Sequence, residues 1–179
     1  MVDTQSIISF WFEETPSELW FKKDENFDRT IIKKFTAIFN AASKGELFIW
    51  RKEPLGRLAE IIILDQFARN MFRGSAKSFA NDPIALVLAH EAVGQNAHLA
   101  LTDKQRPFLL MPYMHSESKL VHEEALKLFK AHAPGNLNFE IGHKNIIDRF
   151  GRYPHRNEVL GRTSTAEETA FLKELGSSY

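Results

Sequence analysis

The amino-acid sequence predicts an all-α fold. Apolar residues recur at helical spacing from end to end of the 179-residue chain, and no segment has the two-residue alternation typical of a strand. A faint internal repeat sets Ala89–Val93 against His122–Leu126, near the period of about 34 residues of tetratricopeptide helix pairs. We therefore predict one domain, residues 1–179, as a tetratricopeptide-like array of about eight or nine antiparallel helices around a central apolar helix.

Start and stop signals divide the first half of the chain into four helical segments. A helix over Ile7–Phe12 is followed by a short one that opens at residues 16–17. Asp24 is expected to cap a longer helix that Gly45 ends. The next helix runs over residues 54–72 and is apolar nearly all round, which predicts that it lies at the centre of the fold.

Start and stop signals in the second half of the sequence predict five further helices. Their expected boundaries are a start at residues 81–83, a start at 102–103 with an end at Pro112, a cap at Ser116 or Ser118, a loop at 134–135 before the helix that reaches Phe150, and a capped start at 165–168. On the last helix, Phe171, Leu172 and Leu175 form an apolar stripe that is expected to dock onto the body.

The composition excludes several classes of function. Lys+Arg and Asp+Glu number 23 each, so we expect no nucleic-acid or membrane partner. The chain has no cysteine, which excludes thiol chemistry and fits a cytoplasmic location, and its N-terminal residues resemble neither a signal peptide nor a membrane span. No Gly-rich phosphate loop, nucleophile elbow or dinucleotide fingerprint is present, so we expect no cofactor.

Aromatic residues crowd the N-terminal third. They fall at helical core spacing without interleaved Lys or Arg, so we expect them to pack in the core rather than to form a stacking platform for nucleobases. These residues are Phe10, Trp11, Phe12, Trp20, Phe21, Phe27, Phe35, Phe39, Phe48 and Trp50.

The most informative segment is the turn from Arg149 to Asn157, which gathers cationic and amide side chains around Gly and Pro hinges. A guanidinium presents a planar fork matched to carboxylate or phosphate, and a histidine adds a donor whose charge changes near neutral pH. The residues expected to bind an anion here are Arg149, Arg152, His155, Arg156 and Asn157. In the alternative interpretation the turn is a clasp, whose arginines pair with carboxylates and lock the last helices onto the central one.

A second polar cluster interrupts the most apolar helix. Asp65, Arg69 and Arg73 recur every four residues and share one face, where Asp65 and Arg69 are expected to pair. Asn70 extends this polar stripe to one side. The cluster is either a buried ion pair that fixes helix register or one wall of a polar pocket.

A third cluster lies at the predicted helix break, from Tyr113 to Glu117, where backbone and side chains can both face a ligand. His115 and Glu117 are expected to form an acid/base pair. Helix capping by residues of the break stays open, as does a metal site completed by residues 122–123 and His143. Since no metal-binding motif is present, we expect no metal, and His143 is either a hydrogen-bonded histidine or part of the polar site.

Several short segments, which together span most of the chain, are specific as a set. They are Phe10-Trp11-Phe12, Trp20-Phe21 with Asp24, Phe27 and Asp28, Gly56-Arg57-Leu58-Ala59, Leu64-Asp65-Gln66-Phe67, Arg69-Asn70, His115-Ser116-Glu117, His143 with Ile146-Ile147, Arg149 to Asn157, and Ser164-Thr165 through Phe171-Leu172. This set resembles an uncharacterised, mainly bacterial family catalogued as domain of unknown function 924. The resemblance implies an all-helical, tetratricopeptide-like fold and no particular activity. Ala68, His122 and Tyr153 depart from the usual pattern of that family, where Pro, Gln and Phe are expected.

Two functional hypotheses follow. In the first, the three clusters surround a pocket for a small phosphorylated or carboxylated ligand, which the protein either only binds or also converts by acid/base catalysis. The roles expected there are anion binding by Arg69, Arg152 and Arg156, proton transfer by His115 or His155 with Asp65 or Glu117 orienting it, and positioning by Asn70 and Asn157. In the second, stacked helix pairs present a groove to a peptide or partner protein, and the polar clusters are structural.

Overall fold

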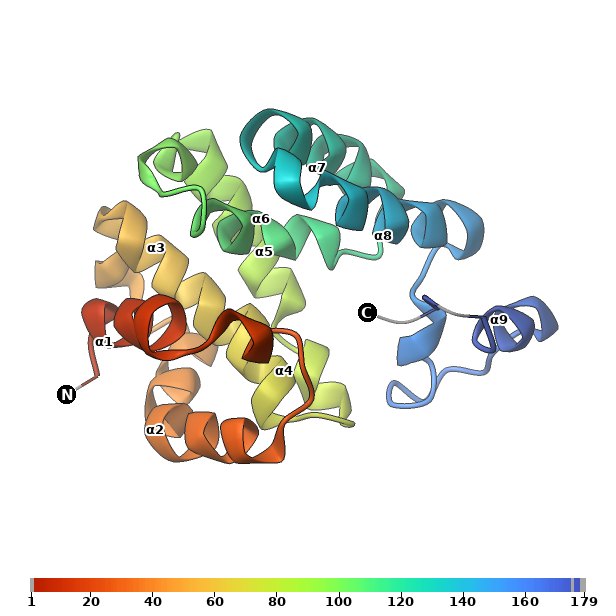
Figure 1. Cartoon of the computed structure of the whole chain (residues 1–179), viewed down its shortest axis with the longest axis horizontal. Coiled ribbons are helices and arrows are strands. Elements are labelled where there is room, and N and C mark those ends of the chain that lie inside the picture. Colours follow the sequence, from red (N-terminus) through yellow and green to blue (C-terminus); the bar gives the residue numbers. More distant parts are fainter. Residues whose placement is uncertain (1, 175, 178–179) are drawn as a thin grey trace.

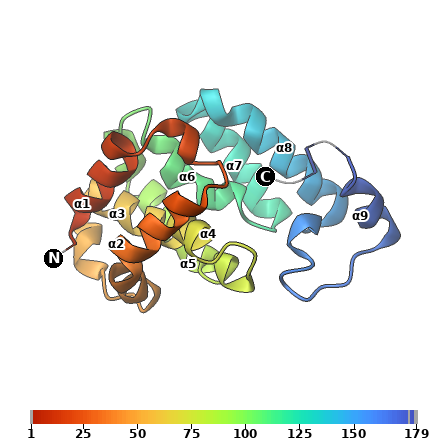
Figure 2. The same ribbon diagram turned by 60° about the horizontal axis from the view of Figure 1, so that its bottom comes forward.

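A computed structural model describes residues 2–174 and 176–177, and all regular structure within them is helical (Figures 1 and 2). The prediction of an all-α fold is therefore confirmed, whereas the tetratricopeptide-like arrangement and the single domain stay predictions. The α-helices are α1 (Thr4–Ser9), α2 (Glu25–Ser43), α3 (Pro54–Ile61), α4 (Ala68–Met71), α5 (Asp82–Gly94), α6 (Arg106–Met114), α7 (Lys119–His132), α8 (Leu137–Phe150) and α9 (Ala166–Phe171).

The predicted central helix is continuous but not regular. α3 and α4 are joined by a π-helical segment, Ile62–Phe67, in which every residue is buried. α3 packs against α1, α5 and α6, as its apolar circumference predicts. The π-helical segment carries Asp65 and Gln66, so two polar side chains enter the interior where the helix widens.

Edge-to-face aromatic packing dominates the core beside this helix. The fully buried Trp11 lies with its ring centre 5.5 Å from that of Phe67 and 5.8 Å from that of Phe108. Core packing was the wrong prediction for Phe21 and Phe48, which are 70% and 60% exposed. Both lie outside the α-helices, where helical spacing does not determine the direction of a side chain.

Several predicted helix boundaries are confirmed by their caps. The Asp24 carboxylate accepts hydrogen bonds from the first amides of α2, and Thr165 and Glu168 form a reciprocal capping box at the start of α9. Gly151 ends α8 with φ of +71°, a left-handed conformation that glycine adopts without steric cost. This turn directs the chain back toward the central helix.

Of two boundary predictions near the helix break, the end at Pro112 was wrong and the cap of the following helix was confirmed. α6 continues through Pro112 to Met114, although proline cannot donate the backbone hydrogen bond of that position. α7 is capped by Ser118, one of the two predicted capping residues, whose hydroxyl accepts a hydrogen bond from Val121 N. His115 therefore follows a helix that is buried from Pro107 to Met114, next to a short connection.

The predicted apolar stripe of α9 is shorter than expected. The Phe171 ring lies 5.0 Å from that of Phe150, as part of a small hydrophobic cluster with Tyr153. Leu172 is 37% exposed and takes no part in the cluster, and Leu175 lies outside the described residues. Because this cluster is small, the C-terminal segment depends heavily on polar contacts for its docking.

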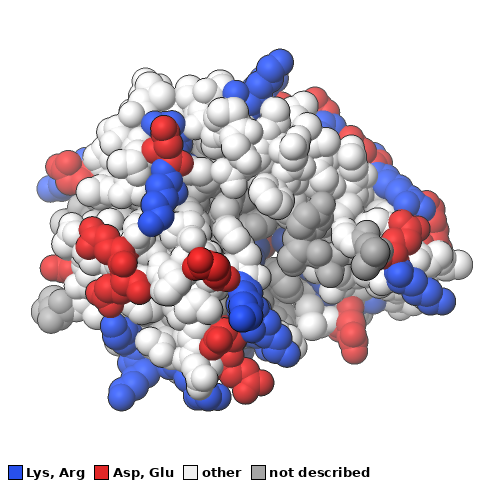
Figure 3. Space-filling view, in the orientation of Figure 1, with Lys and Arg blue, Asp and Glu red and all other residues white. Residues whose placement is uncertain are grey.

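The charges on the face shown in Figure 3 are mixed, with acidic and basic side chains interspersed around its edge, in line with the balanced composition. Among the described residues, no helix combines the length and the apolar composition that a membrane crossing requires.

Candidate functional site

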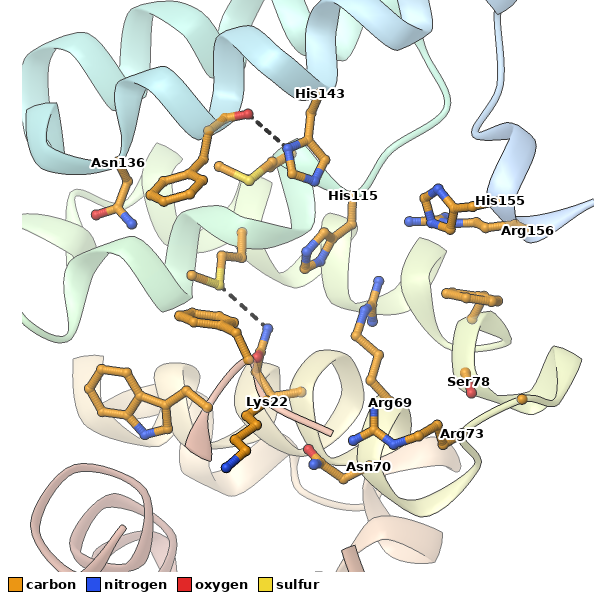
Figure 4. Close-up of a pocket in the computed structure, with 18 residues that line it drawn as sticks. Lys22, Arg69, Asn70, Arg73, Ser78, His115, Asn136, His143, His155 and Arg156 are labelled. Carbon is orange, nitrogen blue, oxygen red and sulfur yellow. Dashed lines mark hydrogen bonds between the residues drawn. The ribbon is translucent and has the colours of Figure 1, made fainter. Parts of the chain in front are cut away.

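A cavity of about 550 Å³ lies between the central helix, the C-terminal end of α6, the start of α8 and the turn after α8 (Figure 4). This volume is within the range of about 300–1,000 Å³ that small-molecule sites occupy. Of the residues predicted for a site, the cavity is lined by Arg69, Asn70, Arg73, His115, His143, His155 and Arg156. The other described lining residues are Trp20, Phe21, Lys22, Gln66, Gly74, Ser78, Phe79, Met111, Met114, Asn136 and Phe139.

Asp65 and His115 form a hydrogen-bonded pair in the cavity wall. His115 Nδ1 lies 2.7 Å from Asp65 Oδ1, and the Asp65 carboxylate, which is fully buried, also accepts a hydrogen bond from Gln66 Nε2 at 2.6 Å. Burial opposes ionisation of Asp65, but Arg69 and His115 together lower its pKa. Burial, reinforced by Arg69, also lowers the pKa of His115. The neutral imidazole therefore donates Nδ1–H to the carboxylate and keeps a lone pair on Nε2.

Asp82 connects two arginines that are distant in the sequence. Arg69 Nη1 and Nη2 donate to the two oxygens of Asp82 at 3.0 Å each, and Arg156 Nη1 donates to Asp82 Oδ2 at 3.3 Å. The predicted pair of Arg69 and Asp65 is also confirmed, with Nη1 and Oδ1 3.1 Å apart. The start of α5 thus ties the central helix to the turn after α8.

Arg156 is buried between two aromatic rings. Its guanidinium carbon lies 4.5 Å from the ring centres of both Phe79 and Tyr153, and the residue is 6% exposed. Nη1 is bonded to Asp82, while Nε and Nη2 donate to no other described residue. Burial, reinforced by the charge of Arg69, lowers the pKa of Arg156, so the site holds a desolvated cation with unused donors.

Two further histidines, His143 and His155, line the cavity, and Figure 4 places them with His115 around the same space. Burial, followed by the charge of His115, lowers the pKa of His143 to about 3. Burial, followed by Arg156, lowers the pKa of His155 to about 4. His143 Nδ1 donates to the carbonyl of Phe139 at 2.8 Å, whereas the buried Nδ1 of His155 has no partner among the described residues. Both imidazoles are therefore uncharged at neutral pH.

Arg73 and Asn70 reach the cavity from its rim but are already engaged. Both donate to the carboxylate of Asp28 on α2, at 2.8 and 2.9 Å from Arg73 and at 2.8 Å from Asn70. This arrangement fixes the central helix against α2. It leaves these two predicted ligand-binding residues fewer free donors than Arg156 has.

In the turn from Arg149 to Asn157, some residues act as the predicted clasp and others line the cavity. Arg149 pairs with Glu167 at 2.8 Å, and Arg152 donates twice to Glu168, at 2.6 and 2.8 Å. Asn157 also donates to Glu168, at 3.3 Å. These three residues hold α9 in place and do not line the cavity, whereas His155 and Arg156 do line it.

The predicted acid/base pair of His115 with Glu117 was wrong, because Asp65 takes the imidazole instead. The Glu117 carboxylate accepts two hydrogen bonds from Arg162, at 2.6 and 2.9 Å, and a third from the amide of Tyr153. Glu117 is consequently part of the same C-terminal clasp and lies outside the cavity lining.

Tyr113 also lies outside the cavity lining. It is 2% exposed, and its ring centre lies 4.6 Å from that of His90. Burial raises the pKa of its hydroxyl. We assign Tyr113 to the packing of α6 against α5.

Sequence reasoning missed three residues that shape the site. In the sequence, Asp82 is recognisable only as part of a helix start signal and Asp28 only as part of the family resemblance, and no pattern marks Phe79. An acidic residue in the first turn of a helix is common for local reasons, so its second role depends on which arginines the fold brings to it. The one signal in the sequence is that the polar clusters hold more arginines than carboxylates, so buried arginines need carboxylate partners from elsewhere in the chain.

The donor set of the cavity restricts its chemistry. Ser78 is the only hydroxyl residue among the described lining residues, and its Oγ donates to the carbonyl of Phe72. Within the described part of the chain, no three His, Asp or Glu side chains are placed to hold a metal ion. The cavity thus offers an oriented imidazole, His115, and a buried guanidinium, Arg156, as its reactive groups.

Comparison with known proteins places this chain in a family. The family described as bacterial protein of unknown function (DUF924) matches residues 7–176. The chain belongs to this family. A solved structure of a protein of unknown function from Agrobacterium tumefaciens is similar throughout, with 35% sequence identity, a TM-score of 0.90, and coverage of 95% of this chain and 96% of that one. No curated protein matches. The similarity supports the all-helical fold of this DUF924 member and brings no activity with it.

Proposed function

We propose that the cavity binds a small anionic ligand, carboxylated or phosphorylated, and that the pair of Asp65 and His115 exchanges a proton with it. The observation that carries the proposal is the state of Arg156, a buried cation whose Nε and Nη2 are without described partners and whose neighbours are uncharged histidines. A ligand anion would complete those hydrogen bonds, because leaving buried donors unsatisfied is costly.

The aromatic rings that flank Arg156 favour recognition over a purely structural role. Phe79 and Tyr153 hold the guanidinium flat, so its free edge keeps a fixed direction before any ligand arrives. Asp82 fixes the other edge through Nη1. A preorganised fork of this kind suits the two oxygens of a carboxylate or phosphate.

His115 is suited to act as a general base. Asp65 accepts the Nδ1 proton and so selects the tautomer with an unprotonated Nε2, in the manner of a carboxylate that orients a catalytic imidazole. The lowered pKa keeps this imidazole neutral at pH 7. His115 lines the cavity, so its Nε2 can take a proton from a ligand hydroxyl or from a water molecule beside the bound anion.

A thermal-shift screen of inorganic phosphate, acetate and larger anions tests this proposal. An anion that binds the folded protein raises Tm in proportion to RT ln(1 + [L]/Kd). We expect Arg156→Gln to lose the response and Arg149→Gln to keep it, because Arg149 is an exposed member of the same turn outside the cavity. Equal responses of both variants would contradict the proposal, as would a wild type that no anion stabilises. The alternative of a peptide- or protein-binding module stays a prediction.

A further inference from the structure

The cavity has an apolar side that anion binding alone does not require. Its lining includes Trp20, Phe21, Met111, Met114 and Phe139. Phe21 and Phe139 are 70% and 57% exposed, so two large rings remain in contact with water at the same cavity. Water-exposed apolar surface of this kind, beside a polar recognition group, is typical of a binding site.

Trp20 and Phe21, which form the aromatic wall of the cavity, contact residues of the hydrophobic core. The indole Nε1 of Trp20 donates to the carbonyl of Trp11 at 2.9 Å, and its ring centre lies 4.9 Å from that of the buried Phe108. The ring of Phe21 lies nearly parallel to that of Phe108, with an angle of 6° between them and ring centres 6.1 Å apart. Since Trp20 and Phe21 are anchored to the core, they form a fixed wall that a ligand can pack against without ordering it.

The charge of the cavity limits the charge of the ligand. Among the described lining residues four are cations, and three of these pair with carboxylates behind the wall: Arg73 with Asp28, Arg69 with Asp65 and Asp82, and Arg156 with Asp82. The fourth is Lys22, which is exposed. With the three histidines neutral, these four cations and their three carboxylates leave a single net positive charge on the described part of the site. One negative charge balances this set, whereas a phosphate dianion would be left in excess inside a partly desolvated site.

We infer that the ligand is a monocarboxylate with an apolar body, aromatic or aliphatic, whose carboxylate binds Arg156 while its body packs against Trp20, Phe21 and Phe139. This inference rests on the proposed function, because it assigns a ligand class to the same cavity. It goes further in excluding small hydrophilic anions and phosphate dianions as the preferred ligands.

Calorimetric titration at pH 8 with three probes tests the inference. Octanoate carries the carboxylate and an apolar body, octyl phosphate carries the same body with a dianion, and acetate, measured by displacement of octanoate, carries the carboxylate alone. We expect octanoate to bind at least about tenfold more tightly than acetate, because its methylenes leave water. We expect octyl phosphate to bind more weakly than octanoate, because its second charge is unbalanced.

Two exposed apolar residues provide a matched pair of variants. Phe139→Ala removes part of the apolar side and is expected to weaken octanoate by about threefold or more with little effect on acetate. Leu120→Ala is the control, since Leu120 is 81% exposed and lies outside the cavity lining, and it should bind octanoate like the wild type. Both changes are at exposed positions, so folding is preserved.

The outcomes separate the two proposals. If acetate binds through Arg156 but octanoate binds no more tightly, or if octyl phosphate binds more tightly than octanoate, the inference is overturned and the proposed function survives. If none of the probes binds, or if Arg156→Gln binds them unchanged, the proposed function itself fails. If Leu120→Ala weakens octanoate as much as Phe139→Ala does, the ligand occupies another surface and the inference is again overturned.

Discussion

The substitution Glu168→Gln tests whether the C-terminal segment is docked by its polar clasp. The Glu168 side chain is 3% exposed and accepts hydrogen bonds from Arg152 Nε, Arg152 Nη2, Thr165 N and Asn157 Nδ2, at 2.6, 2.8, 2.7 and 3.3 Å. Glutamine has nearly the same shape but replaces one oxygen with an amide donor. Because every hydrogen-bonding partner of Glu168 is itself a donor, either amide orientation brings two donors together.

The magnitude follows from the contacts that are lost. Removal of one partner of a fully buried ion pair costs about 3–5 kcal/mol, and a single charged hydrogen bond is worth about 1.5–3 kcal/mol. The Arg152 side chain is 29% exposed, so water compensates part of its lost partner. We therefore expect Glu168→Gln to lower the free energy of unfolding by about 2–3 kcal/mol, and Tm by about 4–12 °C for a chain of this length.

Urea unfolding of three proteins provides the measurement. Glu167→Gln is the matched control, since Glu167 is the neighbouring residue on α9, and its pair with Arg149 joins side chains that are 62% and 45% exposed. The control is expected to cost less than about 0.5 kcal/mol. The hydrogen bonds and charge of Arg152 lower the pKa of Glu168 to about 2, so its contribution is complete above pH 4.5 and disappears as the pH falls toward 2. Two results would refute the reasoning. One is an equal loss of unfolding free energy in Glu168→Gln and Glu167→Gln. The other is a difference in unfolding free energy between the wild type and Glu168→Gln that is the same at pH 6 and pH 2.5.

Three other predictions follow from particular contacts. A Cβ added at Gly56 would lie 2.0 Å from the carbonyl oxygen of Trp50. Gly56→Ala should therefore lower the free energy of unfolding in urea by at least about 3 kcal/mol, although alanine favours helices over glycine by about 1 kcal/mol. A variant as stable as the wild type would contradict this close approach. His143 has a pKa of about 3 in the folded protein, so unfolding takes up a proton below pH 6.5. The wild type therefore loses stability between pH 7.5 and 5, and His143→Gln should remove about 2 kcal/mol of this loss. An unchanged dependence of the free energy of unfolding on pH in the variant would be contrary evidence. Nitrogen NMR should find Nδ1 of His115 protonated and Nε2 free at pH 7, with Asp65→Asn shifting the proton toward Nε2; an Nε2–H tautomer in the wild type would be inconsistent with the proposed base.

Local rules predicted the helices better than they predicted the interior polar contacts. The caps at Asp24 and Thr165 and the stop at Gly151 depend on neighbouring residues, so the sequence is sufficient to find them. The pairing of Asp65 with Arg69 is equally local, because the two residues lie one helical turn apart. The π-helical segment between α3 and α4 has no such local signal in the sequence.

The candidate site required the tertiary structure. Three polar clusters were recognised, yet each arginine has a partner that lies far away along the chain: Asp28 for Arg73, Asp82 for Arg156 and Glu168 for Arg152. Composition alone indicates that buried arginines need carboxylates, but not which of 23 acidic residues supplies each one. The turn after α8 therefore could not be divided between a clasp and a cavity wall before the fold was known.

A crystal structure of the protein with octanoate tests the central claim most directly. The account predicts a carboxylate bound to the free edge of Arg156, within hydrogen-bond distance of Nε or Nη2, with the hydrocarbon against Trp20 and Phe21. Arg152 should remain bonded to Glu168 in the complex. A carboxylate bound to Arg149 or Arg152 instead, with the cavity beside Arg156 unchanged, would contradict it.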